Sequence, residues 1–294
     1  MKRISALALV FLVSVSLKAQ NDLMSLLEEN GSKETSYTTA TFKSTRVING
    51  HSIERMLPGQ LDFRISHRFG PLNSGAYNFF GLDQSNIHFS LEYGIFKWLM
   101  IGAGRGSYEK TFDGFSKLSI LRQSNGAVNM PLSVSAVTSI ALKTIKIPEE
   151  NRTNYFSSKL AYTAQILVAR KISPALSLQL APSYVHRNLV STEFDPNDLY
   201  SIGIGGRLKL TKRISFNCEY YYMVNPKKDW SQTVYNPLSL GFDIETGGHV
   251  FQLIFTNSLG MIEKSFIGET TGTWTKGDVN FGFNISRVFS VKHN

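Results

Sequence analysis

Alternation of apolar and polar residues with a period of two is the strongest pattern in this chain. Between Leu61 and Phe69, four apolar side chains alternate with two arginines, an aspartate and a serine, and His67 alone interrupts the apolar face. Successive side chains of a β-strand point to opposite faces, so this pattern predicts a strand with one apolar and one polar face. The same alternation recurs in the ranges 87–93, 176–184, 214–222, 238–245, 249–256 and 279–285.

With the less regular segments included, twelve strands are predicted, and the connections between them alternate in length. Short links follow residues 93, 170, 211 and 246, whereas the longer loops span 70–85, 147–156, 191–198, 226–237 and 259–276. Gly247 and Gly248 suit a two-residue hairpin that needs positive φ. Short turns at one end and long loops at the other are typical of outer-membrane barrels, in which an even number of strands leaves no unpaired edge in lipid.

The predicted fold class is therefore all-β, a transmembrane antiparallel up-and-down β-barrel. No helix is predicted beyond a targeting segment at residues 1–19 and one or two turns near Leu23, Leu26 and Leu27. The strands are expected near 61–69, 86–94, 98–108, 114–123, 131–143, 158–170, 175–189, 199–211, 214–225, 237–246, 249–258 and 278–289.

The apolar faces of these strands carry no charge, as lipid contact requires. Aromatic residues such as Tyr93, Trp98 and Phe289 lie toward predicted strand ends, where amphipathic rings favour a membrane interface. A soluble protein of two packed sheets is the alternative, but the predicted strands are longer than the five or so residues that are usual there. The predicted outward residues include Leu160, Tyr162, Ile166, Leu178, Leu180, Tyr184, Ile202, Ile204, Phe216, Cys218, Phe242, Phe251, Leu253, Phe255, Phe281 and Phe283.

The opposite face points inward and mixes both charges in nearly equal number. A strongly selective pore carries one sign along its constriction, whereas interspersed opposite charges pair into networks that fill a small lumen. Barrels of intermediate strand number are either filled or hold water, so a narrow channel and a largely occluded barrel both remain open. The lumen-facing candidates are Arg64, Arg68, Glu92, Lys117, Arg207, Lys209, Glu219, Asp243 and Glu245.

Arg64 and Arg68 lie four residues apart on the same inward face, with Ser66 between them on that face. One hypothesis is that their two guanidinium groups hold a carboxylate or phosphate bidentately. The alternative is that they pair with Glu92 and Asp62 inside the lumen.

The chain has 294 residues, a formal net charge of +9 and a single cysteine, Cys218. Lys2 and Arg3 precede an apolar stretch that is too short to span a bilayer, and Ala19 offers a cleavage site, so residues 1–19 are predicted to be a signal peptide. Residues 20–59 are predicted to form a helical or plug-like segment in the lumen or periplasm, and residues 60–294 the barrel. The modest positive charge is weak evidence for a polyanionic partner, and no nucleic-acid partner is expected.

Catalytic and metal-binding patterns are weak, so neither enzyme activity nor a cofactor or metal is predicted. Gly102, Gly104 and Gly106 lack the following helix that a dinucleotide site needs. His67, His186 and Asp195 are expected near the rim, where membrane-embedded hydrolases act, but each stands without a neighbouring base or orienting group. The histidines show no metal-ligand spacing.

Several segments also resemble a family of Bacteroidota outer-membrane β-barrel proteins that is named as a domain of unknown function. This resemblance covers the chain from about Thr41 to Phe289 and implies a membrane-bound barrel in a Gram-negative outer membrane, with no substrate to transfer. Residues 279–289 also resemble the closing strand signal that the barrel-assembly machinery recognises. The segments are FKSTRVINGHSIE, LDFRISHRFG, FGLDQSNIHFSLEYG, DGFSKLSILRQ, GIGGRLKLTKRISFNCEYYY, GFDIETGGHVFQLIFTNSLGMIEKSFIGET and DVNFGFNISRVF.

The sequence thus predicts an exported outer-membrane barrel that is porin-like or related to transport of small solutes. An occluded barrel that serves as a subunit of an outer-membrane complex is the alternative, and a hydrolase at the rim is a third. The expected partners are the lipid bilayer, the barrel-assembly machinery during biogenesis and further outer-membrane proteins.

Overall fold

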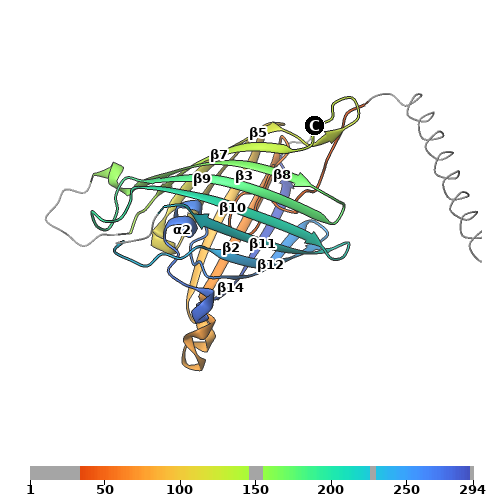
Figure 1. Cartoon of the computed structure of the whole chain (residues 1–294). Helices are drawn as coiled ribbons and strands as arrows, with labels where there is room; N and C mark the ends of the chain where they lie inside the picture. The colour runs from red at the N-terminus through yellow and green to blue at the C-terminus, as the bar shows by residue number, and fades with distance from the viewer. Residues whose placement is uncertain (1–33, 146–154, 226–229, 292–294) are drawn as a thin grey trace, which may run out of the picture. The chain divides into compact units, whose positions relative to one another are not determined.

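The computed structural model describes residues 34–145, 155–225 and 230–291. Twelve antiparallel strands close into a barrel, in which each strand pairs with the next in sequence and the last pairs with the first (Figure 1). The predicted fold class is confirmed, and every strand lies within a few residues of its predicted range. The strands are β2 (Gln60–Pro71), β3 (Ser85–Phe96), β4 (Leu99–Gly106), β5 (Phe112–Leu121), β7 (Ser133–Leu142), β8 (Leu160–Lys171), β9 (Leu176–Arg187), β10 (Asp198–Lys209), β11 (Ile214–Met223), β12 (Leu238–Thr246), β13 (His249–Thr256) and β14 (Asn280–Ser290).

Two further strands are not part of the barrel sheet. β1 (Ser36–Tyr37) and β6 (Ser124–Asn125) form a separate two-stranded sheet. Residues 124–129, with the described residues up to Ser36, form a small unit of their own, and the rest of the described chain forms the barrel unit.

The barrel has two unlike ends. Gln60 at the start of β2 pairs with Ser290 at the end of β14, so both ends of the barrel chain lie at one end, here called the turn end. The opposite end, which carries the longer connections, is called the loop end. The predicted two-residue hairpin is confirmed, because Thr246 pairs with His249 and both intervening glycines have positive φ. The connection of residues 122–132 is the exception at the turn end, since it is longer than its neighbours.

Apolar side chains predominate on the outer face of the barrel. Side chains that alternate with buried polar residues along each strand lie exposed on this face, as the sequence pattern predicted. Rings from neighbouring strands pack together on it: Phe69 stacks on Phe281 at 5.8 Å, and Phe281 lies tilted against Phe255 at 5.6 Å, measured between ring centroids. Such cross-strand aromatic pairs stabilise the sheet register. None of the described helices is long and apolar enough to cross a membrane.

Two segments outside the barrel strands are buried. One comprises residues 41–53, which precede β2, and the other comprises residues 257–270 of the connection between β13 and β14. The second contains a six-residue helix, α2 (Glu263–Gly268), all of whose residues are buried. The sequence prediction of a plain loop at 259–276 was wrong here, because a helix shorter than two turns gives no readable 3.6-residue period. Short 3₁₀ turns occur at η1 (Leu72–Ser74), η2 (Ala76–Gly81), η3 (Tyr108–Lys110), η4 (Phe156–Lys159) and η5 (Trp274–Lys276).

Candidate functional site

Residues 41–54, here called the plug segment, lie inside the barrel and are held by the inward face of the strands. The carboxylate of Glu219 on β11 accepts hydrogen bonds from three backbone N–H groups of the plug segment, those of Ile48 at 3.1 Å, Asn49 at 3.1 Å and Gly50 at 3.0 Å. A carboxylate that accepts several backbone donors forms strong charge-assisted hydrogen bonds. Glu219 therefore anchors the tip of the plug segment.

The tip is a tight turn that only a small residue allows. Arg46 and His51 form an isolated antiparallel bridge, and the N–H of Val47 donates to the carbonyl of Gly50 at 2.9 Å. A Cβ atom at Gly50 would lie 2.0 Å from the hydroxyl oxygen of Tyr221. Glycine at this position thus allows the turn to approach the barrel wall.

A lysine on the opposite side of the barrel binds the carbonyl groups of the same segment. Lys117 Nζ on β5 donates to the carbonyls of Thr45 at 3.1 Å, Ser52 at 2.9 Å and Glu54 at 2.9 Å. Burial of an ammonium group without an adjacent carboxylate is costly unless its donors are satisfied. The three carbonyls supply that satisfaction, so Lys117 and the plug segment stabilise each other.

Amide side chains complete the lining. They donate to three plug carbonyls: Gln179 to His51 at 2.7 Å, Gln252 to Val47 at 2.7 Å and Asn284 to Ile48 at 3.0 Å. Buried backbone groups need such partners, because an unpaired buried carbonyl or N–H costs free energy. The polar inner faces of β9, β13 and β14 therefore match the backbone of a chain segment.

Charged side chains link the plug segment to both the wall and α2. Arg46 lies 2.9 Å from Glu263 of α2 and 3.6 Å from Glu92 of β3, and Arg64 lies 3.0 Å from Asp62. Burial alone would lower the pKa of Arg46, but Glu263 and Glu92 outweigh it and raise that pKa. Arg46 thus stays charged inside the lumen and connects three elements.

The structure places most of the predicted lumen residues inside the barrel. Arg64, Arg68, Glu92, Lys117, Arg207, Glu219 and Asp243 are at most 3% exposed. Lys209 has the inward parity of Arg207 but is exposed, because it is the last residue of β10 where the wall ends. Glu245 is likewise near the turn end, where its partly exposed carboxylate pairs with Lys43.

The two arginines of the hypothesised anion clamp do not act together. Arg64 pairs with Asp62 and approaches Glu92, which is the alternative arrangement left open by the sequence. Arg68 instead donates to the side-chain oxygens of Asn284 at 3.0 Å and Asn49 at 2.8 Å. Both guanidinium groups are therefore used in fixing the interior.

Sequence reasoning missed Arg46, Asn49 and Glu263, because all three lie outside the barrel strands, where parity does not apply. The Asn49-Gly50 pair, a common turn dipeptide, was the available signal for the plug tip. Nothing comparable in the sequence indicated that Glu263 would meet Arg46 across more than two hundred residues.

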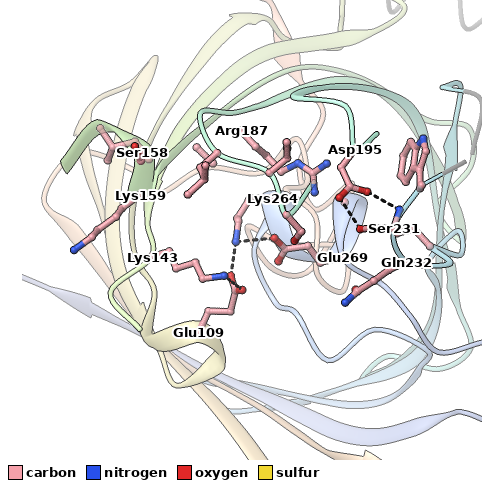
Figure 2. Close-up of a pocket in the computed structure, with 18 of the residues that line it drawn as sticks. Glu109, Lys143, Ser158, Lys159, Arg187, Asp195, Ser231, Gln232, Lys264 and Glu269 are labelled. Atoms are coloured by element: carbon pink, nitrogen blue, oxygen red, sulfur yellow. Dashed lines mark hydrogen bonds and ion pairs between the residues drawn. The ribbon is translucent and has the colours of Figure 1, made fainter. Parts of the chain in front are cut away.

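At the loop end the interior widens into a cavity of about 640 Å³, here called the vestibule. Figure 2 shows Lys264 of α2 between Glu109 and Glu269, with Lys143 on the other side of Glu109. Lys264 Nζ lies 2.7 Å from Glu269. Although burial opposes its charge, Glu269 and Glu109 raise the pKa of Lys264. The vestibule floor is therefore a compact network of ionised groups.

A second group of polar residues lines the other side of the vestibule. Asp195 accepts from the N–H and hydroxyl of Ser231 at 3.0 Å and 2.6 Å (Figure 2) and also from Thr192. The guanidinium group of Arg187 donates to the carbonyl of Pro196 at 2.6 Å. The cavity thus presents positively and negatively charged side chains to a solute that enters it.

The rim residues considered for hydrolysis do not converge. His67 stacks on Phe283, with the ring centroids 5.1 Å apart, whereas Nδ1 of His186 lies 2.7 Å from a carboxylate oxygen of Asp198, which accepts the hydrogen bond. Asp195 lies in the vestibule with the hydroxyl partners named above. The described residues therefore do not join these three side chains in a catalytic arrangement.

α2 separates the vestibule from the plug segment. Glu263 contacts Arg46, the next residue Lys264 contacts the vestibule carboxylates, and Phe266 packs on Tyr221 with the ring centroids 4.9 Å apart. Three further cavities that border the plug segment or α2 are each about 10 Å³, room for about one water molecule. Arg68 and Glu92 are 0% exposed although they point inward, so protein atoms fill most of the lumen at this level.

Comparison with known proteins identifies the family. A model described as membrane bound beta barrel domain (DUF5777) matches residues 42–289. The chain belongs to this family. The resemblance expected from the sequence is thereby confirmed for the membrane-bound barrel domain, and a search of curated proteins gives no match.

Among solved structures, the chain is similar to three outer-membrane proteins at low identity. For the NanC porin the identity is 10%, 79% of this chain and 100% of that chain are covered, and the TM-score is 0.47. For the KdgM porin these values are 8%, 78%, 99% and 0.46. For the COG4313 outer membrane channel from Pseudomonas putida F1 they are 9%, 80%, 97% and 0.49.

Proposed function

We propose that the protein is an outer-membrane barrel for small polar solutes whose pathway is closed by its own plug segment. The observation that carries this proposal is that most inward charges of the wall are at most 3% exposed while Glu219 and Lys117 bind the plug backbone. A permanently open porin would leave such inward charges hydrated. Transport therefore requires that the plug segment leave its position.

The family and the outer surface support the membrane placement. The outward residues are mainly apolar, with exposed arginines near the strand ends, and closed antiparallel barrels are the β-structures that satisfy all backbone groups in lipid. In bacterial barrels the chain ends lie in the periplasm, so we assign the turn end to the periplasm and the loop end to the exterior. Export by the segment of residues 1–19, which lies outside the described residues, belongs to the same proposal.

The vestibule suggests the class of solute. Its lining includes three cations, Lys143, Lys264 and Arg187, and also the carboxylates of Glu109 and Glu269. A site with both signs and about 640 Å³ suits a small polar molecule rather than a hydrocarbon. Such a solute would meet α2 first, directly above the plug segment.

Conductance of the refolded full chain in planar bilayers tests the proposal. The unaltered protein should be silent, whereas Glu219→Ala combined with Lys117→Met should open ion-conducting channels, because both anchors of the plug segment are removed. Gln165→Ala is the matched control, since Gln165 on β8 is equally buried but donates to the side-chain oxygen of Ser183 rather than to the plug backbone. If the double variant folds and remains silent, solute transport through this lumen is refuted.

A reversible lock sharpens the test. A Cβ atom at Gly205 would lie 3.2 Å from a γ carbon of Val47, which is close enough for an engineered disulfide. In a Cys218→Ser background that also carries the two anchor substitutions, Val47→Cys with Gly205→Cys should suppress conductance when oxidised and restore it on reduction. If conductance is the same in the oxidised and the reduced variant, ions take a path other than the one that the plug segment fills.

The alternative of an occluded subunit rests on one loop. The connection between β2 and β3 exposes Tyr77 to 96%, and Phe79 and Phe80 are also largely exposed. Exposed aromatic clusters mark protein contact surfaces more often than isolated ones do. Photocrosslinking from Tyr77 in the native membrane tests this role, and crosslinks to lipid alone would reject it.

A further inference from the structure

The exposed charges at the turn end are almost all positive. Six exposed cations lie in its turns or in the adjoining strand ends, and none of the five connections that join strands at this end contains an acidic residue. By contrast, the connections at the loop end carry both signs in similar number. The six cations, here called the basic ring, are Lys97, Arg170, Lys209, Lys212, Arg213 and Arg287.

The nearby carboxylates are already engaged. Glu245 pairs with Lys43, and Glu54 accepts the backbone N–H groups of Thr41 at 2.7 Å and Phe42 at 3.2 Å. Asp243, on the inner face of β12, is buried. Within the described part of the barrel unit, no ion pair within 4 Å joins a member of the basic ring to a carboxylate.

The basic ring surrounds the barrel instead of forming one patch. Its members come from the β3–β4 turn, the end of β8, both sides of the β10–β11 turn and β14, which are distributed around the closed order of strands. A soluble acidic protein would contact one sector of such a circle. A lipid leaflet contacts all sectors at once.

Each part of the basic ring adjoins an exposed apolar side chain. Trp98 follows Lys97, Leu210 follows Lys209, and the guanidinium group of Arg287 lies 4.9 Å from the ring centre of Phe289. Long basic side chains beside apolar ones at a strand end reach from the hydrocarbon boundary toward the headgroups. The level of the basic ring is therefore the level of a membrane interface.

We propose that the basic ring binds the phosphate groups of anionic phospholipids in the leaflet at the turn end. Arginine and lysine form charge-assisted hydrogen bonds with phosphate oxygens, and phosphatidylglycerol adds a net charge that phosphatidylcholine lacks. This inference rests on the membrane placement made in the proposed function, but it does not depend on the plug segment or on transport.

Trp98 provides a local reporter of these lipids. It is half exposed and stacks on Phe96, whereas the other two tryptophans, Trp230 and Trp274, lie in connections at the loop end. A full-length Trp230→Phe/Trp274→Phe variant in phosphatidylcholine vesicles would be titrated with brominated phosphatidylglycerol or, separately, brominated phosphatidylcholine. For each ring cation that contacts lipid next to Trp98, half-maximal quenching should need an about five-fold lower mole fraction of brominated phosphatidylglycerol than of brominated phosphatidylcholine. Salt should reduce this difference between the two lipids.

Two substitutions separate local binding from a general charge effect. Lys97→Gln should remove about five-fold of the preference at Trp98, whereas Lys110→Gln, an exposed cation at the loop end, should leave it unchanged. The gel shift of the unboiled protein would confirm that each variant is folded.

Equal quenching by the two lipids would overturn the assignment and would leave the basic ring to an acidic protein partner. A preference that Lys97→Gln leaves undiminished would overturn it as well. Absence of quenching by either lipid would refute the membrane placement itself, whereas silent conductance with intact lipid preference would refute transport alone.

Discussion

Removal of the Glu219 carboxylate is the sharpest perturbation of the closed state. Glu219→Ala leaves the N–H groups of Ile48, Asn49 and Gly50 without the acceptor that they have in the barrel. An unsatisfied buried donor costs about 1–3 kcal/mol, and the low end applies because water can enter the space of the lost side chain. Three such donors give about 3 kcal/mol, which corresponds to an increase of about two orders of magnitude in the population with a released plug segment.

Hydrogen exchange of the full chain in detergent measures this population. The informative amides are those of Val47 and Ser52, because they bond to Gly50 and Thr45 within the plug segment and not to Glu219 itself. Their exchange should accelerate by about a hundred-fold, while the amides of the barrel strands keep their protection because the strand ladders are untouched. Gln165→Ala should leave both sets unchanged, because the Gln165 side chain donates to Ser183 and not to the plug segment.

The outcome that would refute this reasoning is equally specific. If the Val47 and Ser52 amides exchange at the same rate in Glu219→Ala and in the unaltered protein, Glu219 is not an anchor of the plug segment. If the strand amides accelerate as much as the plug amides, the plug segment and the barrel unfold as one unit, and no separate open state exists.

Three further outcomes follow from the same contacts. Gly50→Ala places a Cβ atom 2.0 Å from the Tyr221 hydroxyl oxygen, so it should release the plug segment in the same exchange assay, and a Tyr221→Phe background should partly restore protection. In the vestibule, burial alone would raise the pKa of Glu109, but Lys264 and Lys143 lower it below 4.5, and the pKa of Lys264 is raised above 10.5. The fluorescence of Trp230, as the sole tryptophan, should therefore be constant between about pH 5 and pH 10, change as either group loses its charge outside that window, and lose the acid transition in Glu109→Gln. Replacing Tyr77, Phe79 and Phe80 with serine should leave the thermal unfolding of the barrel unchanged, because these side chains are exposed, and should abolish protein crosslinks from this loop if the barrel is a subunit.

The sequence alone determined the barrel and its two faces. A strand has a side-chain period of two, and lipid excludes charge from one face, so the alternation at residues 61–69 and in the other strands determined their number, bounds and polarity. The same parity rule identified Arg64, Lys117 and Glu219 as inward residues. It failed at Lys209 and, in part, at Glu245, because parity says which face a residue occupies and not whether the wall still encloses it there.

Only the tertiary structure decided what fills the lumen. The contacts of Glu219 with residues 48–50, and of Arg46 with Glu263, join positions about 170 and more than two hundred residues apart. They lie in segments without a regular period, so the pattern of residues carries no information about their partners. Whether a polar inner face binds water or the chain's own backbone depends on how those segments pack, and the answer here is a plug segment held by buried charge-assisted hydrogen bonds.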